Sequence, residues 1–204
     1  MVEFRILGPL DVVEHDRQLL LGGPKQRALL AVLLLHRGQV VSMDQLIDQL
    51  WGERPPASAA KSVQVYVSNL RKALGDGLVV TRGRGYLLQA ANGSLDLDRF
   101  EALVTQGRDA LGAGNAQRAS DRLREALALW RGAPLADFAY DSFAQEVIAR
   151  LEEERFRSAG GSHRCRSCDR RAGGAGGRVG GAGCRASVAR AVPGAADVGP
   201  VSLR

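Results

Sequence analysis

Short apolar segments separated by polar residues open the chain. Residues 2–13 and 18–21 are rich in aliphatic side chains, and the polar residues 15–17 lie between them. Apolar runs on either side of a polar turn predict the strands of a small antiparallel hairpin or meander.

A helix that is apolar on nearly every side is predicted next. Pro24 suits the first helical position, and the helix is expected to run to about Arg37, with Gly38 as its stop. A helix without a polar face belongs at the centre of a core.

The uncharged run of this helix, residues 28–35, is far shorter than the roughly 20 residues that cross a bilayer, and no signal-peptide cleavage pattern follows it. No Cys occurs before Ser158, so nothing indicates an oxidising compartment. We expect a cytoplasmic protein without membrane contact.

Two amphipathic helices and a basic hairpin follow. Ser42 and Gln45 have the spacing of a capping box, with a buried stripe behind them formed by Leu46, Ile47, Leu50 and Trp51. Ser58 can cap a helix that extends to about Leu74. Two short strands are then predicted at 78–81 and 86–88, around a turn rich in Gly and Arg.

The pattern becomes purely helical beyond a junction at residues 92–94. Helices are predicted at 98–112, 115–130 and 141–157, because apolar side chains recur there at helical spacing. The short breaks between them favour antiparallel neighbours.

From residue 159 to residue 204 the chain has one Leu, no Ile, no aromatic residue and 11 glycines. Such a segment buries too little apolar area to offset its ordering entropy, so we expect a disordered tail.

The net charge of +6 is not spread evenly along the chain. Residues 159–204 hold eight Arg and two Asp, which account for the entire excess, so residues 1–158 are neutral as a whole. A local excess of positive charge remains between Lys61 and Tyr86, a segment with five basic residues and one acidic residue, Asp76. This local cluster is better evidence of a polyanion site than the total charge.

A helical wheel places the donors of helix 58–74 opposite its apolar face. Val63, Val67, Leu70 and Leu74 share the inner arc. Lys and Arg suit phosphate or guanine, and Asn and Gln suit adenine. A cationic face is often only solvated, but the order of helices followed by a basic hairpin favours DNA binding. The predicted DNA-binding side chains are Lys61, Gln64, Ser68, Asn69, Arg71 and Lys72 on the helix, with Arg82 and Arg84 on the hairpin.

Five segments carry a resemblance to a known family. GPKQRALLAVLL, VVSMDQLIDQLWGERPPASAAKSVQVYVSNLRKALG and VVTRGRGYLL resemble the winged helix of OmpR/PhoB-type response regulators. Together with LDLDRFEALVTQGRDAL and LREALALWRGAPLADF they resemble the antibiotic-regulatory-protein (SARP) family of actinobacterial transcriptional activators, over about residues 2–158.

The resemblance implies an α+β winged helix-turn-helix domain over 1–93, then an all-α, tetratricopeptide-like activation domain over 95–158. Helix 58–74 would enter the major groove, and 78–88 would form a wing on the backbone or minor groove. Related regulators often have Arg or His at the positions of Tyr66, Ser68 and Asn69, so their base preference does not transfer to this chain.

The implied function is activation of transcription, for example of a biosynthetic gene cluster, on the nucleoid. The implied partners are double-stranded promoter DNA and RNA polymerase holoenzyme, with a homodimer on the DNA. Two alternatives stay open, a helical-repeat adaptor for other proteins and the N-terminal part of a larger regulator with an ATPase domain. We expect no receiver domain that could be phosphorylated.

Activation domains of this family usually continue beyond three helices, whereas the resemblance ends near Ser158. We hypothesise that residues 159–204 are a frameshifted continuation, which the coding DNA would test. Loss of the later helices would leave Val147, Ile148 and Leu151 exposed. Trimming 159–204 should then leave DNA binding intact.

Other chemistry has weak support in the sequence. His163, Cys165, Cys168 and Cys184 include one C-x2-C pair without a matching second pair, which is poor support for zinc. Residues 22–25 lack the spacing of a phosphate loop, the glutamates at 152–154 favour a solvated helix face, and no nucleophile, base and acid form a set. We expect neither an enzyme nor any metal or cofactor.

Overall fold

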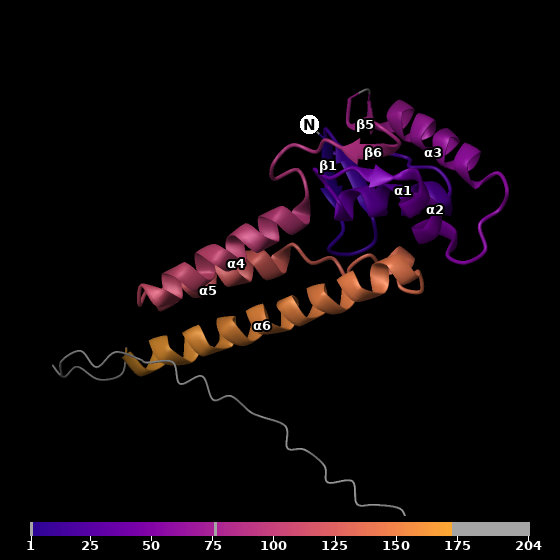
Figure 1. Cartoon of the computed structure of the whole chain (residues 1–204). Helices are drawn as coiled ribbons and strands as arrows, with labels where there is room; N and C mark the ends of the chain where they lie inside the picture. Colours follow the sequence, from indigo (N-terminus) through magenta and orange to yellow (C-terminus); the bar gives the residue numbers. More distant parts are fainter. Residues whose placement is uncertain (1, 76, 173–204) are drawn as a thin grey trace, which may run out of the picture. The chain divides into compact units, whose positions relative to one another are not determined.

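The computed structural model describes residues 2–75 and 77–172 of the chain, and the side chains up to residue 160. Its first sheet is antiparallel in the order β1 (Val2–Arg5), β2 (Asp11–Glu14) and β3 (Arg17–Gln18) (Figure 1). His15 and Asp16 connect β2 to β3 with φ angles of 49° and 61°. Two consecutive residues with positive φ form a turn whose twist matches the strands. The predicted meander is therefore confirmed.

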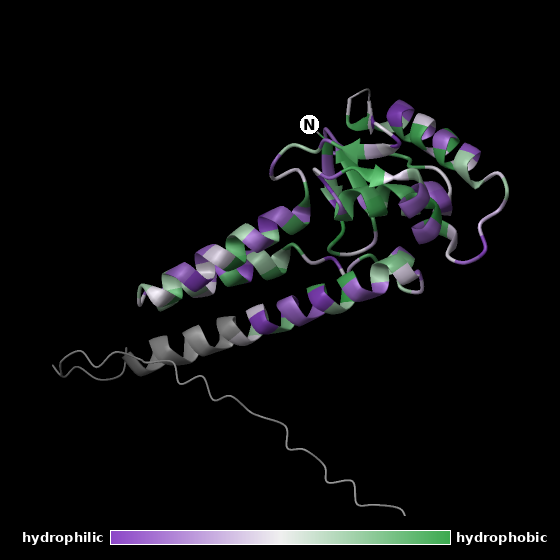
Figure 2. Ribbon diagram, in the orientation of Figure 1, coloured by the Kyte–Doolittle hydropathy of each residue, from purple (hydrophilic) through white to green (hydrophobic). Residues whose placement is uncertain are grey.

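Helix α1 (Pro24–Leu35) lies at the centre of the core, as its all-apolar sequence predicts. Pro24 occupies the first helical turn, and every residue from Ala28 to Leu34 is buried. Figure 2 shows the same helix and the neighbouring strands as largely hydrophobic, whereas the outer helices alternate between hydrophobic and hydrophilic residues.

Helix α2 (Met43–Trp51) begins with the predicted capping box. The Ser42 side chain accepts from the Gln45 backbone, and the Gln45 side chain accepts from the Ser42 backbone. Helix α3 (Ala59–Leu74) begins after Ser58, whose side chain makes no capping hydrogen bond. The reason is local, because Ser58 has ψ near 7° rather than the extended conformation that directs a capping side chain to the helix.

The second sheet has the order β4 (Val41–Ser42), β6 (Gly85–Leu88) and β5 (Val79–Arg82), all antiparallel. The sequence did not reveal β4, which has only two residues. Its approach to β6 requires glycine, because a Cβ at position 85 would lie 2.3 Å from the Val41 oxygen. This pairing fixes the β5–β6 hairpin next to the start of α2.

Three long helices and one short 3-10 turn form the second half of the described chain. They are α4 (Asp96–Gly112), α5 (Ala116–Ala128), η1 (Ala136–Phe138) and α6 (Ser142–Ala172). All three predicted helices are present. Within the described residues, no helix is both long and apolar enough to span a membrane.

Helix α6 corrects the predicted disorder from residue 159. The helix continues to Ala172, although residues 173–204 lie outside the described part. Once a helix has formed, each added residue costs little. Glycines 160 and 161 cost about 1 kcal/mol each relative to Ala, and no proline occurs between Pro134 and Pro193.

The predicted exposure of the α6 apolar face is also wrong. Leu151 is only 3% exposed, and Val147 and Ile148 are partly buried against the main core. Helix α5 packs on α6, and Phe100 of α4 and Leu151 of α6 line the same groove. Three helices are therefore enough to cover this face.

Backbone residues 6 and 7 join the two halves of the chain. The Asp96 carboxylate at the start of α4 accepts from the backbone N–H groups of Ile6 and Leu7, at 2.9–3.0 Å. The carbonyls of the same two residues accept from the N–H groups of Leu135 and Arg131. Because every polar group of this short segment is paired across the junction, one core extends through both halves.

Candidate nucleic-acid interface

Helix α3 separates an inner apolar face from an outer polar one, as its sequence predicts. Val63, Val67 and Leu70 are at most 1% exposed and pack on α1 and α2. The opposite face is exposed and carries Lys61, Gln64, Ser68, Asn69 and Lys72. Tyr66 lies between the faces and stacks on Trp51, with ring centroids 6.5 Å apart. Both aromatic residues therefore belong to the packing of the helices.

Two of the predicted donors on α3 are bound to other parts of the protein. The Asn69 side chain donates to Oε1 of Gln26 at 3.2 Å, on the buried helix α1. Arg71 is half-buried and donates to the Val79 oxygen and to Oγ1 of Thr81, each at 2.8 Å. Local sequence patterns do not predict these partners, because they belong to other elements, 43 residues away for Asn69 and 8 and 10 residues away for Arg71.

The β5–β6 hairpin presents two exposed arginines beside α3. Arg82 ends β5, and the turn consists of Gly83, with φ +55°, and Arg84. Positive φ at the first turn position suits glycine and matches the twist of a two-residue hairpin. The Arg84 oxygen accepts from Met43 N at 3.0 Å. This bond holds the tip of the hairpin to the start of α2.

A groove separates the hairpin from helices α2 and α3. Its volume is about 580 Å³, and its lining includes Asp44, Gln64, Thr81 and Arg84. A polar amide from α3 and a cation from the hairpin therefore face one shared hollow. The Asp44 carboxylate lines the same hollow, so its charges are mixed.

Four cations of this surface form no ion pair in the described part of the chain, although Asp44 lines the same groove as Arg84. Lys61, Lys72, Arg82 and Arg84 form none of the ion pairs found there, in contrast to Arg27, which pairs with Asp137. Unpaired cations on one face create a local positive potential. We name the eight residues Lys61, Gln64, Ser68, Asn69, Arg71, Lys72, Arg82 and Arg84 the basic face.

Comparison with known proteins identifies the two halves. Residues 17–88 match the family described as "Transcriptional regulatory protein, C terminal", and residues 95–166 match "Bacterial transcriptional activator domain". The chain is 42% identical over 155 residues to the regulatory protein AfsR of Streptomyces coelicolor, covering 76% of this chain and 16% of that protein. It belongs to the SARP family of transcriptional regulators.

Two mycobacterial proteins of Mycobacterium tuberculosis are also similar to this SARP-family chain. The transcriptional regulatory protein MoaR1 is 40% identical over 160 residues, covering 75% of this chain and 51% of that protein. The structure of EmbR in complex with a low affinity phosphopeptide has a TM-score of 0.80 and 35% identity, covering 84% of this chain and 47% of that one. The chain thus spans from a sixth to about half of these relatives.

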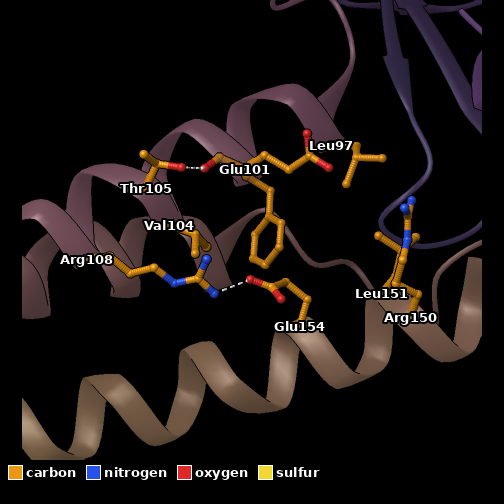
Figure 3. Close-up of a pocket in the computed structure, with 9 residues that line it drawn as sticks. Leu97, Glu101, Val104, Thr105, Arg108, Arg150, Leu151 and Glu154 are labelled. Carbon is orange, nitrogen blue, oxygen red and sulfur yellow. Dashed lines mark hydrogen bonds and ion pairs between the residues drawn. The ribbon is translucent and has the colours of Figure 1, made fainter. Parts of the chain in front are cut away.

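The helical half of the chain contains a second, smaller groove between α4 and α6 (Figure 3). Its volume is about 270 Å³, and its apolar lining is formed by Leu97, Phe100, Val104 and Leu151. Arg108 and Glu154 pair across it, and Thr105 donates back to the Glu101 oxygen. Two of its four charged side chains, Arg108 and Glu154, are therefore engaged with each other.

No metal site is visible in the described residues, where no three His, Cys, Asp or Glu side chains form a cluster. The weak zinc candidates His163, Cys165 and Cys168 lie where side chains are not described, and Cys184 lies outside the described residues.

Proposed function

We propose that this SARP-family chain is a sequence-specific DNA-binding regulator of transcription. Helix α3, here called the recognition helix, would enter the major groove of promoter DNA. Residues 78–88, here called the wing, would lie on the neighbouring backbone or minor groove. The main support is the basic face, whose exposed cations lack carboxylate partners in the described chain. We assign DNA binding to residues 1–93 and activation to 95–158.

The basic face supplies two kinds of contact. Lys61, Lys72, Arg82 and Arg84 would pair with phosphates, which sets the register and makes affinity fall as salt rises. Gln64, Ser68 and Asn69 would read base edges. Phosphate contacts without base contacts would give binding but no sequence preference.

Selection of DNA by the protein tests the proposal. The wild-type chain would select duplexes from a pool with a randomised centre, and fluorescence anisotropy would measure binding to the enriched duplex. We expect Lys72→Ala to weaken binding to all duplexes alike and to reduce the slope of log affinity against log salt by about 0.9. Gln64→Ala should instead relax preference at one base pair, by about 5- to 150-fold.

Arg122→Ala is the matched control, because Arg122 is a partly exposed cation on α5 that pairs with Glu125, away from the basic face. We expect it to leave affinity and salt slope unchanged. Absence of DNA binding even at low salt would overturn the proposal and favour an adaptor that binds protein. Binding without any enriched sequence would overturn only the sequence-specific part.

We also propose that the helical half contacts RNA polymerase holoenzyme and that two protomers bind DNA as a homodimer, at promoters of a biosynthetic gene cluster. The match to an activator-domain family supports the first of these. Single-round transcription by purified holoenzyme, from a promoter with the selected duplex upstream, should rise when the chain is added. Equal transcription with and without the chain would contradict activation, and a complex with one protomer on the full duplex would contradict the homodimer.

A further inference from the structure

The guanidinium of Arg71 joins the recognition helix to the wing. Its Nε donates to the backbone oxygen of Val79 at 2.8 Å, and its Nη2 donates to Oγ1 of Thr81 at the same distance. Both acceptors lie on β5, and both donors belong to one planar group. The side chain therefore holds β5 at two points.

Strand β5 has an open hydrogen-bonding edge at which Arg71 binds. The sheet order β4-β6-β5 leaves one side of β5 without a neighbouring strand. The oxygen of Leu78 accepts from Gln89 N, which follows β6. Because backbone groups alternate in direction along a strand, the next oxygen, that of Val79, is on the open side. Strand β5 lies beside α3 (Figure 1). The Arg71 side chain donates to the Val79 oxygen at the open edge, where a further strand would otherwise pair.

The neighbouring cation, Lys72, behaves differently. Lys72 is exposed, and it has neither a hydrogen-bond nor an ion-pair partner among the described side chains, whereas Arg71 is half-buried. Successive residues of a helix point about 100° apart. Lys72 is therefore directed to solvent, and Arg71 is directed to the wing.

We infer that Arg71 is a positioning residue, which sets the wing against the recognition helix so that Arg82 reaches the DNA. The inference rests on the proposed DNA-binding function. Arg82 directly follows Thr81, so a bond that fixes Thr81 to α3 also limits where Arg82 points. The role requires Arg, because its rigid fork supplies two donors at fixed spacing, whereas Lys carries one compact ammonium on a flexible stem.

A double-substitution experiment on the selected duplex tests the inference. Arg71→Lys keeps the positive charge and removes the fork, and Arg82→Ala removes the wing cation. We expect Arg71→Lys to weaken binding nearly as much as Arg71→Ala does. In the Arg71→Lys background, Arg82→Ala should lower the affinity for the duplex by a further factor of less than about two. A factor of this size is within the scatter of independent substitutions.

The salt dependence gives a second measurement. Arg71→Lys should reduce the slope of log affinity against log salt by about 0.9, because the phosphate contact of Arg82 is lost although no charge has been removed. Lys72→Ala is the matched control. In that background Arg82→Ala should retain its full effect on affinity.

Thr81→Val provides a milder test that leaves every charge in place. It removes the Oγ1 acceptor alone and should reproduce part of the affinity loss of Arg71→Lys. Thermal unfolding of each variant would verify that the fold is intact, which is expected because β6 still pairs with β4 and Met43 still binds the Arg84 oxygen.

Three results would overturn the role of Arg71. Wild-type affinity in Arg71→Lys would show that charge alone matters and that Arg71 contacts phosphate directly. Losses of Arg71→Lys and Arg82→Ala that multiply would show that the wing is placed without Arg71. Wild-type affinity in Thr81→Val would exclude the contact with Thr81. A wild-type chain that binds no duplex would instead overturn the proposed DNA binding.

Discussion

The Asp96 carboxylate combines two opposing effects on one residue. Burial raises its pKa above the ordinary value, while hydrogen bonds from Ile6 and Leu7 and the charge of Arg131 oppose the rise. Burial is the larger effect, so the folded chain binds a proton at this carboxyl more tightly than the unfolded chain does. The contribution of Asp96 to the free energy of unfolding is therefore fully present below the ordinary pKa and declines as pH rises through the raised pKa.

Substitution by a side chain that cannot ionise tests this sign. Asp96→Asn should lower the free energy of unfolding most at acid pH, and its deficit relative to wild type should shrink toward neutral pH, as measured by urea denaturation. Asp121→Asn is the control with the opposite trend, because Arg124 and Gln117 lower the pKa of the exposed Asp121. A deficit of Asp96→Asn that grows with pH would show that the backbone donors outweigh burial.

Side-chain partners distant along the chain are what a helical wheel leaves out. The wheel correctly placed the exposed residues Lys61, Gln64 and Lys72, because the direction of a Cβ follows from the helical period. It gave no account of Asn69 and Arg71, whose partners lie 43 and 8–10 residues away. Those bonds depend on how separate elements pack, which a local pattern does not contain.

The close packing of α4 on α5 depends on a small residue. A Cβ at Gly107 would lie 2.9 Å from Cγ of the buried Leu123, whereas one at Gly112, near the end of the same helix, would meet nothing within 4 Å. Gly107 therefore permits close approach, and Gly112 contributes only its poor helix propensity.

Alanine at the two glycines should act in opposite directions. Gly107→Ala should lower the free energy of unfolding, because overpacking costs typically about 1–3 kcal/mol and exceeds the gain of up to about 1 kcal/mol from helix propensity. Gly112→Ala should raise it by a few tenths to about 1 kcal/mol. Denaturant titration of both variants measures the difference. Stabilisation by both would show that α5 shifts away from α4 freely.

Elements with a strong period were predictable, and those that depend on context were not. Helices α1 to α6 begin within about two residues of their predicted starts, because capping residues and apolar stripes are local signals. Strand β4 is too short to have a period and forms because β6 pairs with it. Composition predicts disorder from residue 159, but the helix continues to Ala172 because no residue in 159–172 forces it to stop.

At the scale of the whole molecule, the length of α6 moves the best position for a truncation from residue 158 to the end of the helix at Ala172. A cut at residue 158 divides α6, whereas a cut after Ala172 spares it. We expect removal of 173–204 to leave the affinity for the selected duplex within about twofold and the salt slope unchanged, because the basic face is retained. A smaller slope after truncation would show that the arginines of 173–204 contact DNA themselves.

The hydrogen bonds that Ile6 and Leu7 make with Asp96, Arg131 and Leu135 also determine which piece of the chain can be exchanged between relatives. A graft that ended at Gly93 would remove Asp96 and leave two inward-facing N–H groups without acceptors. It would also uncover Phe4, which packs in the shared core and whose N–H bonds the Ser94 oxygen. A transferable piece with the proposed DNA-binding function therefore has to extend through Phe138. It then keeps Asp96, the N–H groups of Arg131 and Leu135 that bond the oxygens of Leu7 and Ile6, and the buried Phe138 ring.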